Sequence, residues 1–395
     1  MALERIKTAS ESNLRTVNVC LEHRFYEYKG KYYTKLAFPF SYWKDYLSYF
    51  DKVVIVARVQ KCNVFDPLFV RVDGDNVSVY ALPYYQGIKQ FSRKLFPLIR
   101  AAYSFVKKNE YFILRTGNVT NMFWLFIVLR NKRYLREYPG NIKQGIIGFV
   151  GNKPHVIVLA SFLQFIARIQ ARFSIANSYV SRDCQKLYSS SNPSFIFSSF
   201  NVSELPDICP SRVFDSEVLE VISVGRLEGE KGHEDLIKAV AMFNNNSARP
   251  FEIRLTIIGS GSRLEYLKSL VSSIGLNCSF LGAITDRNKL FNYLVNSDLF
   301  CIPSHTEGMP RALLEAMGMG LPCIGSNVGG IPEILSSDWC FTPNSPQSIC
   351  DMFQKFSKLD NFNTLGEHNR KLIHESYSVE KMSQEKITFW SKLYE

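Results

Sequence analysis

The sequence contains no uninterrupted run of about eighteen apolar residues, the length that marks a bilayer span. Its longest apolar stretches, residues 122–129 and 156–167, are interpreted as elements of a buried core. Residues 1–16 are polar, so we expect no secretory leader. The nine cysteines form no C-x-x-C pair and their number is odd, which favours free thiols in a reducing cytosol. We therefore expect a cytoplasmic protein and not an integral membrane protein.

Motifs for metal or nucleic-acid binding are also missing. The sequence has no D-x-D dyad and no His/Cys cluster, so we expect no metal ion and no cofactor. It has no helix-turn-helix or RNA-binding motif, so nucleic acid is not an expected partner. A chain of 395 residues with 46% hydrophobic and 21% charged residues fits two globular domains.

Positive charge is concentrated in the first half. Residues 1–200 hold 29 Lys and Arg against 12 Asp and Glu, which leaves +17, whereas the later residues carry −6. This asymmetry predicts an anionic partner for the first half. Residues 84–108 interleave aromatic side chains with Lys89, Arg93, Lys94, Arg100, Lys107 and Lys108. That pattern is typical of an amphipathic helix on an anionic membrane surface, although a core-facing stripe with a solvated basic back would look the same.

Strand-like and helical segments alternate clearly in the second half. Apolar runs predict strands at 219–226, 254–259, 278–283, 299–303 and 322–326. Three- and four-residue spacing predicts helices at about 233–243, 263–275, 287–295 and from about 311. The first half alternates less regularly, with strands expected at 17–21, 52–59, 77–85, 111–115, 133–138 and 173–180. Such alternation predicts an α/β protein with doubly wound parallel sheets, joined between about Ser199 and Ser216.

The strongest functional signal is SHTEGMPRALLEAMGMGLPCIGSNVGGIPE, residues 304–333. Pro310 suits the first position of a helix, because its missing N–H costs nothing there. The free amides of Gly308, Met309 and Arg311 would then point at an anion, which the helix dipole favours. This arrangement predicts a phosphate site at the start of the helix.

Two carboxylates flank that predicted helix start. Glu307 lies in the loop before the helix and Glu315 about one turn into it. In a nucleotide-sugar site one carboxylate would accept hydrogen bonds from sugar hydroxyls and the other from ribose hydroxyls. Two solvated glutamates on an ordinary helix are the alternative, which the position at the carboxyl end of a strand disfavours.

A second signal is VGRLEGEKGHEDL, residues 224–236, where Arg226 and Lys231 follow a strand and lie between Gly225 and Gly232. Arg binds phosphate bidentately and Lys binds it as a point charge, so both could hold a diphosphate at the same sheet edge. A solvated basic turn is the alternative.

A third, weaker signal is the G-x-G turn of Gly259 and Gly261. It would let a ligand approach the backbone closely, although a simple tight turn is nearly as good an interpretation. Residues 281–287 occupy the corresponding turn of the next strand and are expected beside the base.

The cation turn, the G-x-G turn and the helix with two glutamates occur in the order and at the distances typical of the family-4 glycosyltransferases. Residues 221–335 therefore resemble this family, whose members are retaining enzymes of the GT-B fold with an E-x7-E helix. The resemblance implies that Arg226 and Lys231 bind donor phosphates, that Glu307 contacts the transferred sugar and that Glu315 holds the ribose. It also implies two Rossmann-like domains that face a central cleft. We expect an acceptor-binding domain at 1–205, a donor-binding domain at 206–375, and a closing helix at 376–395 that returns to the first domain.

The first half departs from the family pattern. Where members often carry a Gly-rich loop after the first strand, this chain has LEHRFYEYKGKYYTK. Where many place a His or an acid beside the reacting sugar, it offers Glu137, a candidate catalytic residue, and Asn141. His23 and Arg24 could line the cleft, although a surface or structural role fits them as well.

The resemblance implies a metal-independent hexosyltransferase that uses a UDP-sugar or GDP-sugar and retains the anomeric configuration. The expected acceptor is a glycan or lipid-linked glycan of bacterial surface polysaccharide assembly, lipopolysaccharide or capsule. The basic first half would then contact the inner face of the plasma membrane peripherally. A nucleotide-sugar epimerase of the same fold and a non-catalytic nucleotide-sugar-binding protein are the alternatives.

Overall fold

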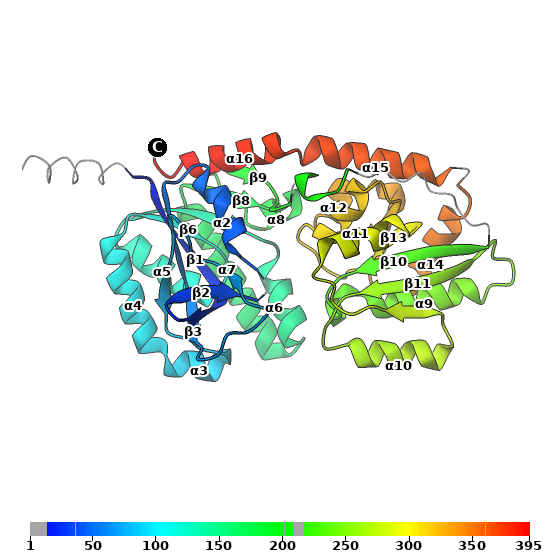
Figure 1. Ribbon diagram of the computed structural model, residues 1–395, viewed down its shortest axis with the longest axis horizontal. Helices are drawn as coiled ribbons and strands as arrows, with labels where there is room; N and C mark the ends of the chain where they lie inside the picture. Colours follow the sequence, from blue (N-terminus) through cyan, green and yellow to red (C-terminus); the bar gives the residue numbers. More distant parts are fainter. Residues whose placement is uncertain (1–13, 36, 201, 208–216, 360) are drawn as a thin grey trace, which may run out of the picture.

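The computed structural model describes residues 14–35, 37–200, 202–207, 217–359 and 361–395. These residues form two lobes, each built on its own sheet (Figure 1). Most of the expected joint, Asn201 and residues 208–216, lies outside the described residues, as does Cys209. The boundaries 1–205, 206–375 and 376–395 therefore remain a prediction. The other eight cysteines are free thiols.

The first lobe contains a nine-stranded sheet. Its strands are β1 (Thr16–Tyr28), β2 (Lys31–Thr34), β3 (Lys52–Lys61), β4 (Val70–Arg71), β5 (Val77–Leu82), β6 (Tyr111–Leu114), β7 (Arg133–Tyr138), β8 (Ala176–Tyr179) and β9 (Ser194–Ile196). The parallel part runs β5-β3-β1-β6-β7-β8-β9, so the strand order reverses between β1 and β6. In a doubly wound sheet this reversal marks the place where ligands bind.

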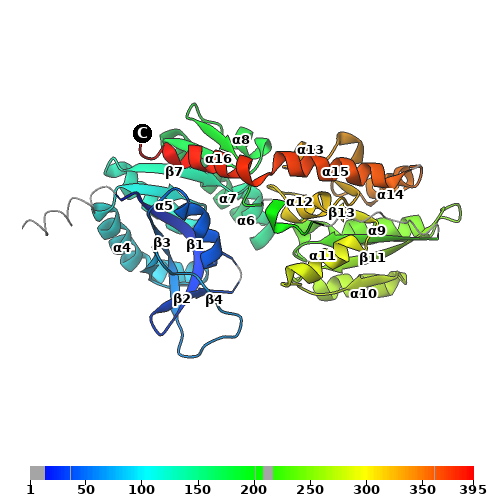
Figure 2. The same cartoon turned by 45° about the horizontal axis from the view of Figure 1, so that its top comes forward.

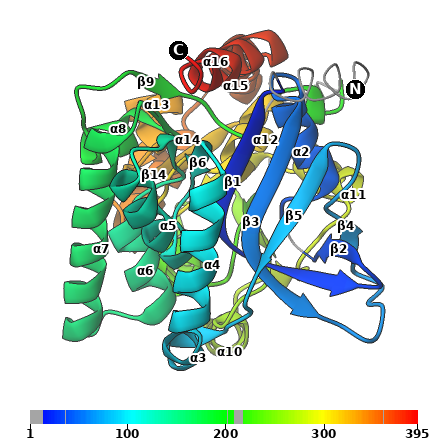
Figure 3. The same ribbon diagram turned by 90° about the vertical axis from the view of Figure 1, so that its left-hand side faces the viewer.

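Helices cover both faces of the first sheet. They are α2 (Phe40–Leu47), α3 (Gly87–Arg93), α4 (Leu95–Lys108), α5 (Asn118–Leu129), α6 (Ile142–Val150), α7 (Pro154–Phe173) and α8 (Arg182–Leu187). Figure 3 shows α4, α5, α6 and α7 together on one side of the strands. Leu98, Ala102 and Val106 of α4 are buried against this sheet.

Residues 84–108 form two helices and not one, since α3 and α4 meet at Lys94. The cause is Pro97: inside a continuous helix it would remove a backbone hydrogen bond, whereas in the first turn of α4 no such bond is needed. The segment is expected either to lie on a membrane surface or to face the core, and its aromatic residues fit both interpretations. Phe105 is buried in the core, whereas Phe96 and Tyr103 are exposed.

The first strand is longer than the sequence predicts. The strand expected at 17–21 continues as β1 to Tyr28, with a register irregularity between Cys20 and Arg24 in its pairing with β3. A two-residue turn then returns the chain into antiparallel β2. Both turn residues, Lys29 and Gly30, have positive φ (48° and 72°), which is typical of a tight hairpin turn. A strand and hairpin therefore occupy the segment where the family often has a Gly-rich loop.

The second lobe contains a six-stranded parallel sheet of order β12-β11-β10-β13-β14-β15. Its strands are β10 (Val218–Val224), β11 (Glu252–Ile258), β12 (Cys278–Phe280), β13 (Leu299–Ile302), β14 (Cys323–Ser326) and β15 (Cys340–Phe341). Its helices are α9 (His233–Asn244), α10 (Leu264–Ile274), α11 (Arg287–Val295), α12 (Arg311–Gly318), α13 (Ile331–Ile334), α14 (Pro346–Phe356) and α15 (Phe362–Ser376). The strand order reverses between β10 and β13. All the strands and helices predicted for this half are confirmed.

The last helix, α16 (Val379–Ser391), lies on the first lobe, while α15 packs on α12 of the second (Figures 1 and 2). Phe389, Trp390 and Leu393 are buried in the core of the first lobe. The ring of Trp390 packs on that of Tyr46, with centroids 4.8 Å apart. The end of the chain therefore packs on the lobe in which the chain begins.

Among the described residues, one helix is long and apolar enough to cross a membrane by length and composition, namely α7. The stretch at 156–167 continues to Phe173, so it is longer than the sequence analysis assumes. Only a third of its most apolar window is buried, which corrects its interpretation as a core element.

Candidate active site

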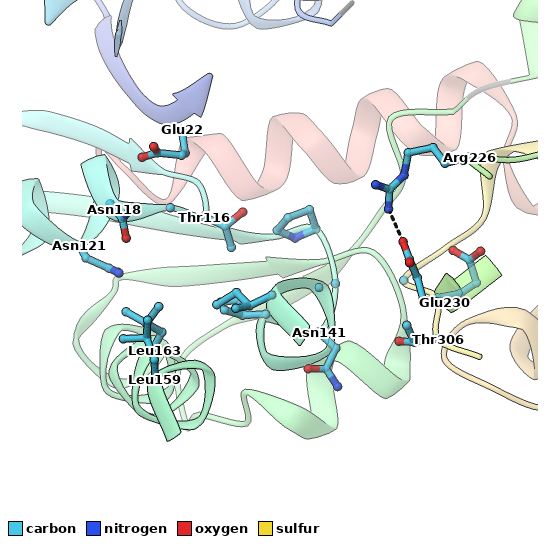
Figure 4. Close-up of a pocket in the computed structure, with 18 of the residues that line it drawn as sticks. Glu22, Thr116, Asn118, Asn121, Asn141, Leu159, Leu163, Arg226, Glu230 and Thr306 are labelled. Carbon is cyan, nitrogen blue, oxygen red and sulfur yellow. Dashed lines mark hydrogen bonds and ion pairs between the residues drawn. The ribbon is translucent and has the colours of Figure 1, made fainter. Parts of the chain in front are cut away.

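A cavity of about 740 Å³ lies between the lobes, at the carboxyl ends of the strands where each sheet reverses its order (Figure 4). The second lobe lines it with Arg226, Glu230, Lys231, Thr306, Glu307 and Gly308. The first lobe lines it with Glu22, Thr116, Gly117, Asn118, Asn121, Arg136, Pro139, Gly140, Asn141, Ile142, Gly145, Ile146, Leu159 and Leu163. The structure thus brings both predicted cations and one predicted carboxylate into one cavity.

Lys231 and Glu307 meet because β10 and β13 are neighbours, so the loops that follow these strands share one sheet edge. Lys231 Nζ donates to Glu307 Oε1 at 2.5 Å, and Ser304 Oγ donates to the same oxygen at 2.7 Å. The two charged side chains are 18% and 10% exposed. They form a fixed, weakly hydrated pair on one wall of the cavity.

Arg226 lies at the rim of this wall, with 60% of its side chain exposed. Its Nη2 donates to Glu230 Oε1 at 2.7 Å, an interaction drawn in Figure 4. The other oxygen of Glu230 is buried and has no hydrogen-bond partner among the described residues. Arg226 thus lines the cavity from its rim, and an anion bound there would compete with Glu230 for its guanidinium.

The helix that follows Glu307 begins at residue 311, as its periodicity predicts, but Pro310 precedes it and is not its first residue. Pro310 is the N-cap and Arg311 is the first helical residue, because the ψ of Pro310 is 110°, which is extended and not helical. In the described part of the chain, the amides of Gly308 and Met309 donate no hydrogen bond. Gly308 lines the main cavity, whereas Met309 and Arg311 line a second, neighbouring cavity. Unpaired amides at a helix start are suited to anion binding.

Gly308 is also a point of contact between the lobes. A Cβ atom at this position would lie 2.8 Å from the Pro139 carbonyl oxygen and 3.4 Å from the Gly140 Cα. On the other side, Gly330 donates its amide to the Gly308 carbonyl at 2.8 Å. Glycine is therefore required here for the close approach of two backbones.

Glu315 does not lie with the other candidates. It is 4% exposed and does not line the cavity. Arg287 Nη2 donates to its Oε1 at 3.1 Å, and Arg311 lies 3.7 Å from the same oxygen. Burial raises the pKa of Glu315, while the two arginines oppose the shift. The prediction that it holds the ribose would require its exposure, so the structure adds no support to that role.

The turn glycines serve backbone packing. A Cβ atom at Gly259 would lie 1.8 Å from the Gly225 carbonyl oxygen, and one at Gly261 would lie 2.3 Å from that of Leu227. Gly225, Gly259 and Gly261 do not line the cavity. The G-x-G turn therefore lets two loops of the second lobe pack closely, which favours the tight-turn interpretation over direct ligand contact.

Glu137 lies in a neighbouring cavity and not in the one that holds Lys231. Its carboxylate accepts a hydrogen bond from the Tyr46 hydroxyl at 3.2 Å and lies 3.3 Å from Arg115 Nη1. Successive residues of a strand point to opposite faces, so Glu137 turns away from the cavity that Arg136 lines. The prediction that Glu137 lies beside the reacting sugar therefore gains no support from its position.

Asn141 lines the main cavity, and its side chain also caps α6 by accepting from the Gln144 amide at 3.0 Å. His23 lies outside the cavity lining, contacts the Thr34 hydroxyl at 3.1 Å and packs on Phe25. Burial and the neighbouring Arg24 lower the pKa of His23 to about 4. Arg24 itself is exposed. For His23 and Arg24, a structural or surface role is therefore favoured over a role in lining the cleft.

Comparison with known proteins identifies the second lobe. Residues 208–378 match the family model described as Glycosyl transferases group 1. The match covers less than half of the chain, and this part is called the group 1 domain below. This domain holds Arg226, Lys231 and Glu307, which form the second-lobe wall of the cavity.

Two relatives match different lengths of the chain. Protein CapJ of Staphylococcus aureus is 24% identical over 335 residues, which cover 83% of each protein. The amylovoran biosynthesis glycosyltransferase AmsK of Erwinia amylovora is 32% identical over 150 residues, which cover 35% of this chain and 36% of AmsK. The chain thus spans little more than a third of the second relative.

Two solved structures share the whole two-lobed architecture. Sucrose-phosphate synthase from Thermosynechococcus elongatus has a TM-score of 0.73 at 16% identity and covers 96% of this chain and 99% of its own. Anabaena HepE in complex with UDP-glucose has a TM-score of 0.64 at 15% identity, with coverage of 94% and 98%. The fold of the chain is GT-B, as predicted.

Several residues around the group 1 domain have no signal in the sequence. Glu230 follows the predicted cation turn, yet its interaction with Arg226 depends on the 3-10 turn at Gly229–Lys231. Gly329 (φ 54°) packs on the Glu307 carbonyl, where a Cβ atom would lie 2.0 Å from the oxygen. Glu22 lies within the irregularity of β1, between Cys20 and Arg24, in the segment where this chain departs from the family pattern.

Proposed function

We propose that the chain is a retaining glycosyltransferase that moves a sugar from a nucleoside-diphosphate donor to an acceptor held between the lobes. The observation that carries the proposal is the second-lobe wall of the cavity. There two cations, the unpaired amide of Gly308 and the carboxylate of Glu307 face one space. A diphosphate-linked sugar needs cations and amides for its phosphates and a carboxylate for its hydroxyls.

The donor we propose is a UDP-sugar or a GDP-sugar. A structural neighbour, HepE, was solved with UDP-glucose, and it shares the GT-B fold of this chain. In doubly wound sheets, ligands bind at the carboxyl ends of the strands where the strand order reverses. The group 1 domain lines the cavity at this place of its own sheet. Base and sugar would be chosen by the loops around the cavity, which differ among proteins of one fold.

In the proposed reaction the acceptor hydroxyl attacks the anomeric carbon from the face that the diphosphate leaves. The bond from the anomeric carbon to the phosphate oxygen breaks, the new glycosidic bond forms, and the departing phosphate oxygen takes the hydroxyl proton. Configuration is retained without a covalent enzyme intermediate. Arg226 and Lys231 stabilise the growing charge on the diphosphate, which is the kind of electrostatic contribution that usually dominates. These cations do for the diphosphate what a metal ion would do, so we propose a metal-independent reaction.

The acceptor we propose is a lipid-linked glycan of polysaccharide biosynthesis, at the cytoplasmic face of a membrane. One relative, AmsK, is named for amylovoran biosynthesis. The outer surfaces of α4, α5 and α7 expose large apolar side chains, namely Phe96, Ile99, Tyr103, Leu125, Leu129, Val158, Phe162 and Phe165. Exposed lysines and arginines of α3 and α4 lie on the same side of the first sheet as these apolar side chains (Figure 3). This combination is suited to an anionic lipid surface.

Vesicle binding tests the membrane part of the proposal. The protein should sediment with vesicles that contain anionic phosphatidylglycerol at low salt and less so with neutral phosphatidylcholine vesicles. A Phe162→Asp/Phe165→Asp variant should lose binding, whereas Tyr266→Asp, a matched change of an exposed aromatic in the second lobe, should not. Failure of the wild type to bind anionic vesicles even at low salt would remove this part of the proposal.

Release of the nucleoside diphosphate tests the reaction. The protein should release UDP or GDP from a matching sugar donor when a lipid-linked acceptor is added. A nucleotide-sugar epimerase would change the sugar without releasing the diphosphate, and a non-catalytic binding protein would bind the donor without any turnover. Binding without release across UDP-, GDP- and ADP-linked sugars, with acceptor present, would overturn the proposal.

A further inference from the structure

Arg136 is a buried cation without a carboxylate partner. It is 1% exposed, and among the described residues no carboxylate oxygen lies within 4.0 Å of its guanidinium. Two nearby arginines, in contrast, each have a carboxylate partner. Arg58 lies 2.8 Å from Glu22, and Arg115 lies 3.3 Å from Glu137.

Neutral groups hold Arg136 in place. Its Nη1 donates to the carbonyls of Leu114 and Glu137 at 2.9 and 2.8 Å, and its Nε donates to the Gln170 side chain at 3.0 Å. Gln170 in turn donates to the Asn121 side chain at 2.9 Å. Its guanidinium also lies over the ring of Tyr138, 4.5 Å from the ring centroid. None of these partners carries a negative charge, so the buried charge of Arg136 is kept at a cost that a bound anion would offset.

The surroundings of Arg136 belong to the first-lobe end of the main cavity. Thr116, Asn118 and Asn121 line it beyond the end of β6, beside the place where the first sheet reverses its strand order. In Figure 4 these side chains lie on the opposite side of the cavity from Arg226. This end is therefore separate from the wall proposed for the donor diphosphate.

Glu22 also lines this end of the cavity, but its charge is already matched. Its Oε1 accepts from the Tyr85 hydroxyl at 2.7 Å and lies 2.8 Å from Arg58 Nη2. Its Oε2 accepts the Val119 amide at the start of α5 at 2.8 Å. With Glu22 fully occupied, the net charge at this end of the cavity is that of Arg136.

One side of the same space is apolar. Ile142 and Ile146 of α6 and Leu159 and Leu163 of α7 line it. Leu159, Leu163 and Asn121 line the same cavity, so the space has both apolar and polar walls (Figure 4). Leu159 is itself exposed, which connects the cavity wall with the outer surface of α7.

We infer that this end of the cavity binds the phosphate ester of a lipid-linked acceptor, with Arg136 as the cation for the phosphate and the α6–α7 wall as the contact for the chain. The inference deepens the proposed function and rests on it. It assigns a binding role to Arg136 and to the side chains of Thr116, Asn118 and Asn121, which can donate or accept hydrogen bonds around the anion.

Calorimetry with simple probes tests the inference. Dodecyl phosphate, below its micelle concentration, carries both features of the ligand. Inorganic phosphate lacks the chain, dodecyl glucoside lacks the charge, and glucuronate carries a carboxylate without a chain. Dodecyl phosphate should bind more tightly than the other three. Equal or tighter binding of inorganic phosphate, dodecyl glucoside or glucuronate would overturn the inference.

Variants then locate the anion. Arg136→Gln should weaken dodecyl phosphate binding by about tenfold or more, and Arg136→Lys, which keeps the charge but not the planar fork, should weaken it less. Because Arg136 is buried, Asn118→Asp gives a second test at an exposed position and should weaken binding by about fivefold or more through charge repulsion. Asn292→Asp, the same change on exposed α11 of the second lobe, is the control.

The result can be separated from failure of the proposed function. Nucleotide binding is measured independently with UDP and GDP, and its absence in the wild type would count against the donor site alone. Wild-type affinity for dodecyl phosphate in both folded Arg136→Gln and Asn118→Asp would overturn the inference, whatever the nucleotide result.

Discussion

Replacing Lys231 with methionine removes the ammonium of the second-lobe wall and keeps the length of the side chain. The ammonium lies 2.5 Å from Glu307 in a site that is mostly closed to solvent, with side-chain exposures of 18% and 10%. A hydrogen bond to a charged group contributes roughly 1.5–3 kcal/mol. If the same ammonium binds the donor diphosphate, the dissociation constant for UDP or GDP should rise by about tenfold to 150-fold. Isothermal titration calorimetry measures this change.

The same substitution should also lower the free energy of unfolding, by about 1–3 kcal/mol, because Glu307 keeps only Ser304 as a partner. Lys238→Met is the matched control. Lys238 donates to Glu234 at 2.8 Å but is 45% exposed and lies outside the cavity, so nucleotide affinity should not change. A folded Lys231→Met protein that binds both nucleotides as tightly as the wild type would refute the reasoning.

Four further changes follow from the geometry of the site. Arg226→Ala should lower kcat/KM by about tenfold to a hundredfold or more, because a phosphate-binding guanidinium is lost, and unchanged turnover in steady-state kinetics would contradict its role. Glu230→Gln frees Arg226 from a partly exposed pair, so donor affinity in calorimetry should rise by at most about fivefold, and weaker binding would contradict the pairing seen here. Gly308→Ala should lower kcat/KM by about tenfold, since its Cβ would lie 2.8 Å from the Pro139 carbonyl oxygen and separate the lobes; wild-type kinetics would contradict that close contact. Burial and Lys231 lower the pKa of His233 to about 4 from 6.5, so the unfolded chain takes up a proton first, and the free energy of unfolding should fall by up to about 3 kcal/mol between pH 6.5 and pH 4. Urea unfolding at both pH values measures the last effect, and a His233→Gln variant with the same pH dependence would contradict it.

The second lobe could be predicted from sequence because its signals are local. The Asp286 side chain caps α11 by accepting from the Asn288 and Lys289 amides, so this helix begins at Arg287 as predicted. Gly275, with φ of 66°, ends α10 one residue after Ile274. The pairing of Lys231 with Glu307 follows from strand order alone, since each residue lies just beyond one of two neighbouring strands.

The rest of the site depends on contacts between segments far apart in the chain. Arg311 lies four residues before Glu315, so their contact is local, but nothing in the sequence indicates that Arg287 of α11 also covers Glu315. In the first lobe, the extension of β1 past Cys20 places Glu22 in the cavity, whereas the sequence predicts a strand that ends at residue 21. That Arg136 has no carboxylate partner among the described residues follows only from the positions of all its neighbours, which the sequence does not give.

The central claim is that Arg226, Lys231 and Glu307 converge on one diphosphate-linked sugar. A crystal structure of the protein with UDP or GDP tests it most directly. The diphosphate should lie within hydrogen-bond distance of the Arg226 guanidinium, the Lys231 ammonium and the amide of Gly308. A nucleotide bound elsewhere, with the Lys231–Glu307 pair and the Arg226–Glu230 pair undisturbed and the cavity unoccupied by phosphate, would contradict it.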